Sequence, residues 1–169
     1  LGKTPTTLAS LGPSRVHGPG LVIAPPAVVG NWASEARKFM PHLKVLVHHG
    51  QNRRKSKDFL KAVDETDIVI TTYGTAVRDI DLLEQVHFGK AVIDEAQAIK
   101  NPAAETSRQL RRINAHTRLA LTGTPIENGL GDLWSILDWS NPGLLGPRAQ
   151  FIAQLSPAKK TKESNEVAL

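Results

Sequence analysis

The chain has 169 residues, enough for one domain with a buried core, and its 40% hydrophobic and 22% charged content excludes wholesale disorder. It contains no cysteine, which excludes disulfides and thiolate chemistry, and no apolar run approaches the roughly 18 residues of a membrane span. Lysine and arginine number 21 against 16 acidic residues, and the net charge of +5 is compatible with a polyanionic partner.

The chain begins Leu1-Gly2-Lys3-Thr4, and Gly-Lys-Thr is the closing half of a phosphate-binding loop, whose backbone N–H groups cradle phosphates. In such a loop Lys3 reaches the β and γ phosphates, the Thr4 hydroxyl binds the metal, and residues 5–11 form the helix that follows. The first glycine of the loop would lie five residues before Gly2. We therefore expect a domain that lacks its first strand and the start of the loop, although glycine-lysine pairs are also common in surface turns.

Strand-like and helix-like segments alternate along the rest of the chain. Apolar, β-branched runs predict strands at 21–24, 44–48, 67–71, 91–93 and 118–122. Apolar spacing of three to four predicts helices at 28–39, 53–63, 75–84, 103–113 and 131–139. This alternation favours an α/β fold, a mainly parallel sheet with helices on both faces. Residues 156–169 are rich in lysine, serine and glutamate and are expected to form a mobile tail.

The run Ala91-Val92-Ile93 ends abruptly in two adjacent carboxylates, Asp94 and Glu95. Open α/β sheets bind ligands just outside the carboxyl ends of their strands, so these acids are expected where a ligand would lie. Adjacent side chains on extended backbone point different ways, so one acid can face a phosphate-bound Mg²⁺ and the other a water molecule. The alternative is structural: Asp94 opens a turn and Glu95 caps the next helix.

Three further segments follow strands at the same predicted edge. They are Pro25-Pro26 to Glu35 with Gly30-Asn31-Trp32, then Thr71-Thr72-Tyr73, then Leu121-Thr122-Gly123-Thr124-Pro125-Ile126-Glu127-Asn128. Together with Ile93 to Pro102, Gly131 to Trp134 and Asn141 to Leu145, this ordered pattern resembles the Swi/Snf-type branch of the superfamily-two helicase-related ATPases, in a bacterial-looking form. The resemblance covers roughly residues 1–150.

The resemblance implies a three-layer RecA-like P-loop NTPase domain, the first of two such lobes in a motor that uses ATP to move along double-stranded DNA. Residues 1–155 would form the ATP-binding lobe, and 156–169 would lead to the second lobe. That second lobe supplies the arginine that reaches the γ-phosphate in this family, so the isolated lobe is expected to be inactive. A nucleoprotein or RNA polymerase is a possible further partner. The expected location is cytoplasmic, at the nucleoid in a bacterium, or nuclear in a eukaryote, with no membrane.

The resemblance also implies roles for particular residues. The catalytic residues are Lys3 and Glu95; ATP is bound by Gly2, Lys3, Thr4, Asp94, Glu95 and Gln97; and Mg²⁺ is held by Thr4 and, through water, by Asp94. Nucleotide state is coupled to lobe movement by Gln97, Thr122, Gly123 and Thr124. The DNA backbone is contacted by Pro25, Pro26, Asn31, Thr72, Tyr73, Lys100 and Asn101. Gln97 departs from many relatives, which carry histidine there; an amide can still hydrogen-bond but cannot become charged near neutral pH.

Several features have simpler interpretations. Trp32 shares a helical stripe with apolar residues and is predicted to lie in the core rather than on DNA, as are Trp134 and Trp139. The pair His48-His49 is predicted to be structural or solvent-facing. The basic clusters, Arg53-Arg54-Lys55 with Lys57 and Arg108 with Arg111 and Arg112, can be solvated helix faces. Two alternative functions are a nucleotide-gated binding module without motor activity and a P-loop domain that acts on a small metabolite.

Overall fold

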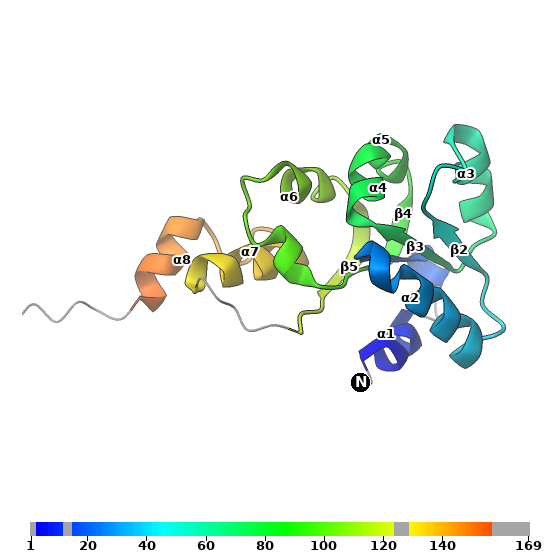
Figure 1. Ribbon diagram of the computed structural model, residues 1–169. Coiled ribbons are helices and arrows are strands. Elements are labelled where there is room, and N and C mark those ends of the chain that lie inside the picture. The colour runs from blue at the N-terminus through cyan, green and yellow to red at the C-terminus, as the bar shows by residue number, and fades with distance from the viewer. Residues whose placement is uncertain (1–2, 12–14, 124–128, 157–169) are drawn as a thin grey trace, which may run out of the picture.

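The computed structural model describes residues 3–11, 15–123 and 129–156, with the side chains of 3–6 and 15 left out of the description. Its centre is a five-stranded parallel sheet in the order β2-β3-β1-β4-β5 (Figure 1). The strands are β1 (Gly20–Ala24), β2 (Val45–His48), β3 (Ile68–Thr72), β4 (His87–Ile93) and β5 (Asn114–Ala120). The predicted α/β fold with a parallel sheet is confirmed.

Helices cover both faces of the sheet. On one face, α1 (Lys3–Leu11) and α2 (Pro26–Phe39) pack against Val22, Ala24 and neighbouring residues of β3 and β4. On the other, α3 (Ser56–Asp64), α4 (Tyr73–Arg78) and α5 (Ile80–Leu83) pack against Leu21 and Ile23. Successive residues of β1 therefore enter opposite cores, and all five are buried. This explains why β1 reads as a continuous apolar run rather than an alternating one.

The remaining elements precede β1, connect β4 to β5 or follow β5. They are the 3₁₀ turns η1 (Arg15–His17) and η2 (Ala96–Ile99), and the helices α6 (Glu105–Leu110), α7 (Leu130–Ser140) and α8 (Arg148–Leu155). Figure 1 shows α7 and α8 extending beyond β5. Trp139 of α7 is 1% exposed and belongs to the same apolar cluster as α3 to α5. In the ranges the structure describes, no helix is long and apolar enough to cross a membrane.

The structure differs from the predicted boundaries in several elements, and β4, for example, begins at His87 rather than at 91. The predicted helix at 75–84 is divided into α4 and α5, because the helix is interrupted at Asp79. The carboxylate of Asp79 is held by Arg53 and His48. β5 begins at Asn114 rather than at 118. It is an edge strand whose first residues are mostly polar and partly exposed, so they lack the apolar run by which a buried strand is recognised in sequence. Helix α8 was not predicted at all. Of the predicted tail, only Ser156 lies within the described residues.

Candidate active site

The two acids Asp94 and Glu95, here called the acid turn, lie directly after β4 at the carboxyl edge of the sheet. Backbone hydrogen bonds fix this turn on both sides. Asp94 N–H donates to Ile23 O of β1 at 2.8 Å, and Ala96 N–H donates to Leu121 O, just after β5, also at 2.8 Å. The acid turn is therefore framed by the ends of two neighbouring strands, where open α/β sheets bind ligands.

Asp94 is half-buried, and each of its carboxylate oxygens accepts one hydrogen bond from the residues that the structure describes. Oδ1 accepts from the backbone N–H of Glu95 at 2.9 Å, and Oδ2 accepts from the indole N–H of Trp32 at 3.0 Å. An ionised carboxylate has about four lone-pair positions, so each oxygen can still accept one more bond. This donor set fits Mg²⁺, which keeps several waters and is commonly held by one or two carboxylates together with substrate phosphates.

Glu95 has a left-handed backbone, with φ 54° and ψ 56°. A residue with a side chain adopts this conformation at a cost of order 1 kcal/mol, so the surrounding contacts must hold it. Glu95 occupies the N-cap position of η2, as the structural interpretation expected, but its side chain makes no capping hydrogen bond there. Its carboxylate instead accepts from the amide nitrogen of Gln97.

Gln97 connects Glu95 to the segment after β5. Its amide oxygen accepts from the hydroxyl of Thr122 at 3.1 Å, while its amide nitrogen donates to Glu95. The structure thus brings together Asp94, Glu95, Gln97 and Thr122 in one hydrogen-bonded group. Gly123 is exposed beside it, and Thr124 lies outside the described residues.

Tyr73 also joins this group, although the sequence placed it on the DNA surface. Its hydroxyl donates to Asp94 O at 2.5 Å and lies 3.4 Å from Glu95 O. Burial, followed by the nearby carboxylates of Asp94 and Glu95, raises the pKa of the Tyr73 hydroxyl far above its usual range. Tyr73 therefore stays protonated and remains a donor to the acid turn.

The other residues predicted to contact DNA fall into two groups. Thr72 is 2% exposed and is the N-cap residue of α4. Its hydroxyl accepts a hydrogen bond from the backbone N–H of Thr75. The exposed residues are Pro26, Asn31, Lys100 and Asn101, and Pro25 is partly exposed. All five lie in the segments that follow β1 or β4. Their role on DNA stays a prediction.

Helix α1 is oriented so that its first turn points toward the same edge. Its last residues lie at the opposite, amino edge, because Lys90 Nζ donates to Ser10 O at 3.2 Å and the Leu11 side chain lies against Gly20, the first residue of β1. A nine-residue helix spans about 13 Å, close to the length of β1. The backbone of Lys3 and Thr4 therefore lies toward the acid turn, whereas Gly2 lies outside the described residues.

The basic segment after β2 divides into a structural part and an exposed part. Arg53 donates twice to Asp79, at 2.6 and 3.0 Å, and His48 Nε2 contacts the same carboxylate at 2.8 Å. The hydrogen bond from Arg53 lowers the pKa of Asp79, and burial lowers the pKa of His48 despite the carboxylate. The prediction of a structural role for His48 is confirmed.

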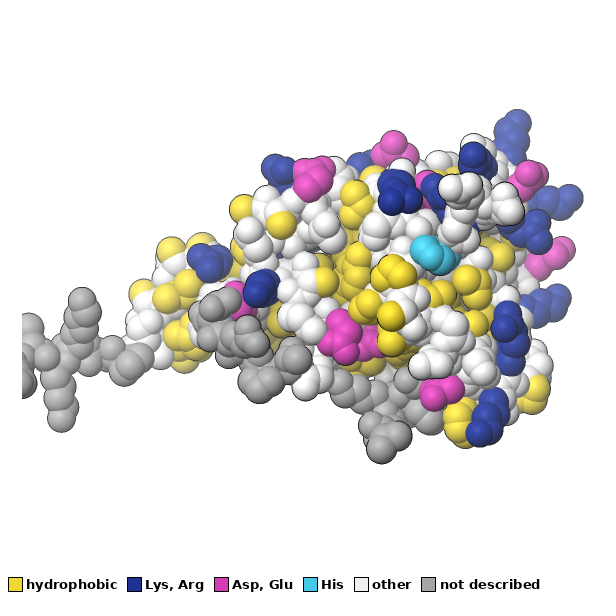
Figure 2. Space-filling model, in the orientation of Figure 1, with side chains coloured by type: hydrophobic (Ala, Val, Ile, Leu, Met, Phe, Trp, Pro, Cys, Tyr) yellow, Lys and Arg dark blue, Asp and Glu magenta, His cyan; other side chains and the backbone are white. Residues whose placement is uncertain are grey.

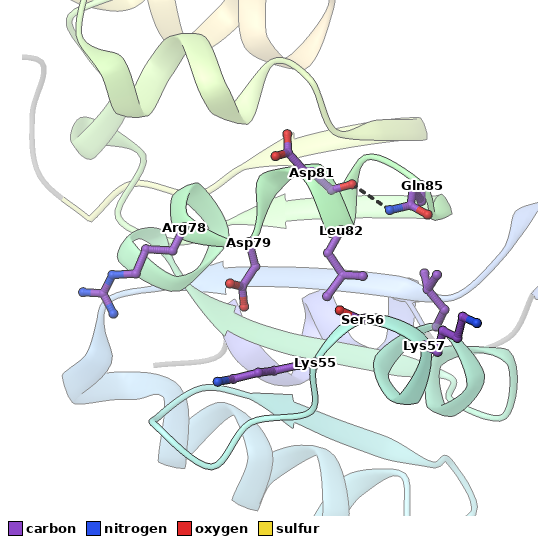
Figure 3. A pocket seen from close by; sticks show the side chains of 9 residues that line it. Lys55, Ser56, Lys57, Arg78, Asp79, Asp81, Leu82 and Gln85 are labelled. Atoms are coloured by element: carbon purple, nitrogen blue, oxygen red, sulfur yellow. Dashed lines mark hydrogen bonds between the residues drawn. The ribbon is translucent and has the colours of Figure 1, made fainter.

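Lys55 and Lys57 instead line a groove of about 430 Å³ between α3 and α4–α5, together with Arg78, Asp79 and Leu82 (Figure 3). This groove contains none of the residues predicted to bind nucleotide or DNA. Figure 2 shows that lysine and arginine gather at the end of the molecule where α3 and the last turns of α2 lie. The second basic cluster forms ion pairs: Arg108 with Glu105, Arg111 with Asp138, and Arg112 with Asp81 and Glu84.

The tryptophans were predicted to be core residues. Trp32 and Trp139 are 2% and 1% exposed, which confirms the prediction, whereas Trp134 is only half-buried and donates to Gly146 O. The sequence did not reveal the contact between Trp32 and Asp94. A tryptophan predicted to be buried needs an acceptor for its indole N–H, so a contact of this kind could be expected. Sequence spacing does not identify the acceptor, which lies 62 residues away.

A parallel α/β sheet with polar groups gathered at the carboxyl ends of its strands places this chain in the class of open α/β domains that bind ligands at that edge. Comparison with known proteins identifies the family: the SNF2-related domain matches residues 1–169, and the chain belongs to this family. The fold matches the archaeal structure described as "Sulfolobus solfataricus SWI2/SNF2 ATPase core in complex with dsDNA" with a TM-score of 0.78 and 42% identity, over 90% of this chain and 32% of that one. This confirms the RecA-like lobe expected from the resemblance.

Similar proteins are found in bacteria and eukaryotes. The "Putative ATP-dependent helicase/translocase YwqA" of Bacillus subtilis is 38% identical over 154 residues, which are 90% of this chain and 17% of that protein. The "TATA-binding protein-associated factor MOT1" of Saccharomyces cerevisiae is 35% identical over 133 residues, 79% of this chain and 7% of that protein. The chain therefore spans less than a fifth of the length of either relative.

Proposed function

We propose that residues 1–155 form the first RecA-like, ATP-binding lobe of a DNA-dependent ATPase that couples hydrolysis to movement on double-stranded DNA. The observation that carries this proposal is the hydrogen-bonded group of Asp94, Glu95, Gln97 and Thr122 at the carboxyl edge of the sheet. Membership of a family that includes ATP-dependent helicases and translocases supports it.

In this proposal the phosphates of ATP bind at the start of α1. Backbone N–H groups at a helix N-terminus attract anions, and the first turn of α1 points toward the acid turn. Gly2 and Lys3 would cradle and neutralise the β and γ phosphates, and Thr4 and Asp94 would hold Mg²⁺. Mg²⁺, when bound, neutralises charge on the phosphates. Asp94 would act through water, using the lone pairs that Trp32 and the Glu95 backbone leave open.

Glu95 would orient the attacking water and accept its proton. A general base must lie within about 3 Å of the proton that it takes, so the direction of its carboxylate matters as much as its charge. Gln97 sets that direction by donating to Glu95, and Thr122 in turn holds Gln97. Thr122, Gly123 and Thr124 would sense the γ-phosphate and pass its presence to lobe movement.

DNA would bind along the loops that follow β1 and β4. Lys100 and Asn101 are exposed after η2, and Pro26 and Asn31 are exposed on α2. Lysine and amide side chains contact phosphates without reading bases, so binding would be independent of sequence and sensitive to salt. A solved relative with 42% identity is an ATPase core in complex with dsDNA, which supports this ligand.

A second lobe of the same polypeptide would supply the arginine that completes the transition state. Such arginines contribute on the order of 10³ to 10⁵ in rate. We therefore expect this chain alone to turn over ATP very slowly. Rapid multiple turnover by the purified 169-residue chain would contradict this part of the proposal.

The proposal is tested by Glu95→Gln in the full-length polypeptide. We expect ATP and DNA binding to be retained, and DNA-stimulated hydrolysis to fall by about 10² or more, because the base is lost while shape is kept. Glu105→Gln is the matched control, since Glu105 is an exposed carboxylate on α6 and should leave turnover unchanged. Full activity in Glu95→Gln would remove Glu95 from this role. A wild-type protein that binds ATP and DNA but never hydrolyses ATP would instead be a nucleotide-gated binding module.

A further inference from the structure

We propose that Trp32 and Tyr73 are positioning residues that fix the acid turn from opposite faces of the sheet, Trp32 through the carboxylate of Asp94 and Tyr73 through its backbone. The inference rests on the function proposed above for Asp94 and Glu95. It adds two aromatic residues that touch neither nucleotide nor DNA in that proposal but determine where the metal-binding and water-activating groups lie.

Trp32 controls the direction of the Asp94 carboxylate. Its ring is 2% exposed and is packed in the cluster formed by α1, α2 and the sheet, which includes Leu8, Val29 and Val92. Because packing leaves the ring little freedom, the indole N–H points at Asp94 Oδ2 from a fixed place, at 3.0 Å. An indole N–H buried without an acceptor is unfavourable, so the contact also resists rotation of the carboxylate.

Tyr73 controls the backbone of the acid turn. It is the first residue of α4, and its hydroxyl meets two consecutive carbonyl oxygens, those of Asp94 and Glu95. These carbonyls flank the left-handed conformation of Glu95. In an extended backbone, successive carbonyls point in opposite directions. A hydroxyl that contacts the carbonyl oxygens of both Asp94 and Glu95 therefore favours the left-handed conformation of Glu95 over an extended one.

The sheet order explains how two distant residues reach the same turn. β1 lies between β3 and β4, so Tyr73, directly after β3, reaches past the end of β1 to the end of β4. Trp32 approaches from α2, on the other face, and its ring belongs to the opposite apolar cluster. Tyr73 packs against the cluster on its own face. The acid turn is thus held between the two cores of the domain.

The two contacts predict different defects. Trp32→Phe keeps an aromatic ring but removes the N–H, so the Asp94 carboxylate gains freedom, and we expect the Mg²⁺ concentration for half-maximal nucleotide binding to rise about tenfold, as for other partners of metal ligands. Tyr73→Phe leaves the Asp94 carboxylate and its indole contact in place. We expect it to lower kcat severalfold, because Glu95 loses its backbone support, with the Mg²⁺ dependence unchanged.

The experiment uses the full-length polypeptide and two measurements. Polarisation of a fluorescent ADP analogue, titrated at a series of Mg²⁺ concentrations, reports the metal dependence without turnover, and DNA-stimulated hydrolysis reports kcat. Trp139→Phe is the matched control: Trp139 is equally buried, its Nε1 has no hydrogen-bond partner among the described residues, and it lies in the cluster away from α2. It removes an equally buried indole and should leave the Mg²⁺ dependence unchanged.

The outcomes separate this inference from the proposed function. Equal Mg²⁺ dependence of wild type, Trp32→Phe and Trp139→Phe would overturn the role of Trp32, and an unchanged kcat in Tyr73→Phe would overturn that of Tyr73. Failure of the wild type to hydrolyse ATP would contradict the proposed function, while the ADP titration would still decide the role of Trp32. If Trp32→Phe does not fold, Asp94→Asn should reproduce its Mg²⁺ defect and the Tyr73→Phe measurement still stands; a normal Mg²⁺ dependence in Asp94→Asn would overturn the inference.

Discussion

Gln97 accepts a hydrogen bond from the hydroxyl of Thr122, 25 residues further along the chain, at 3.1 Å. The same side-chain amide donates to Glu95. An amide is both donor and acceptor at every pH at which the protein is folded, so this connection between the segments after β4 and β5 does not depend on protonation.

Gln97→His should therefore make the coupling pH-dependent. A neutral imidazole can replace both bonds, with one nitrogen donating and the other accepting, but below a pH of about 6.5 both nitrogens donate and the acceptor for Thr122 is lost. We expect the ratio of DNA-stimulated to basal hydrolysis to match wild type at pH 8 and to fall severalfold by pH 5.5. In a Thr122→Val background the substitution should add no pH dependence. A flat profile in Gln97→His alone would contradict the connection.

The contacts of Asp79 predict a loss of stability on acidification. Hydrogen bonding to Arg53 lowers the folded-state pKa of Asp79, so its contribution is present above the unfolded pKa of about 3.9 and is lost as pH falls through the folded value. Burial lowers the folded-state pKa of His48. As pH falls below the unfolded pKa of about 6.5, the unfolded state takes up a proton that the folded state does not, so the free energy of unfolding declines. Both effects act in the same direction.

We expect the melting temperature to fall from pH 7.5 to pH 5, and the fall to be smaller in His48→Gln, which cannot be protonated. The measurement is thermal unfolding followed by circular dichroism across this range. His42→Gln is the control, because His42 is exposed in the turn after α2 and its removal should leave the slope as in wild type. Identical slopes for wild type and His48→Gln would exclude His48 as the source.

Lys100→Ala should weaken DNA binding by the same factor on unrelated sequences and reduce the slope of log affinity against log salt by about one, as expected for a single phosphate contact. Lys61→Ala is the matched control, since Lys61 is exposed on α3 near the end that leads to the amino edge of the sheet. The measurement is fluorescence anisotropy of labelled duplexes at several salt concentrations. A sequence-dependent loss, or an unchanged salt slope, would count against a backbone contact.

The sequence predicted the features that depend on local pattern. Apolar runs predicted the buried strands β1, β3 and the end of β4, and the adjacent acids lie, as expected, directly after β4 at the carboxyl edge of the sheet. Their order along the chain was sufficient to identify the family. The contact of Gln97 with both Glu95 and Thr122 followed the predicted grouping of these residues, because all of them lie at carboxyl ends of parallel strands.

Features that depend on long-range side-chain contacts could not be predicted. The helix break at Asp79 results from a carboxylate held by Arg53 and His48, 26 and 31 residues away, and no local signal marks it. Thr72 ends β3 and Tyr73 follows it; the hydroxyl of Thr72 caps α4, and that of Tyr73 reaches the acid turn. Hydroxyl groups suit a phosphate and a backbone carbonyl equally well, so sequence does not distinguish the two uses.

The position of β2 at the end of the sheet has a consequence for the protein in solution. An open edge strand presents unpaired backbone groups on which a second copy of the chain can add its own strand, the first step of aggregation. Exposed cations lie before and after this strand, at Lys44, Arg54 and Lys55. Two copies that approach edge to edge would bring these like charges together. Repulsion between these charges disfavours such pairing at the β2 end of the sheet.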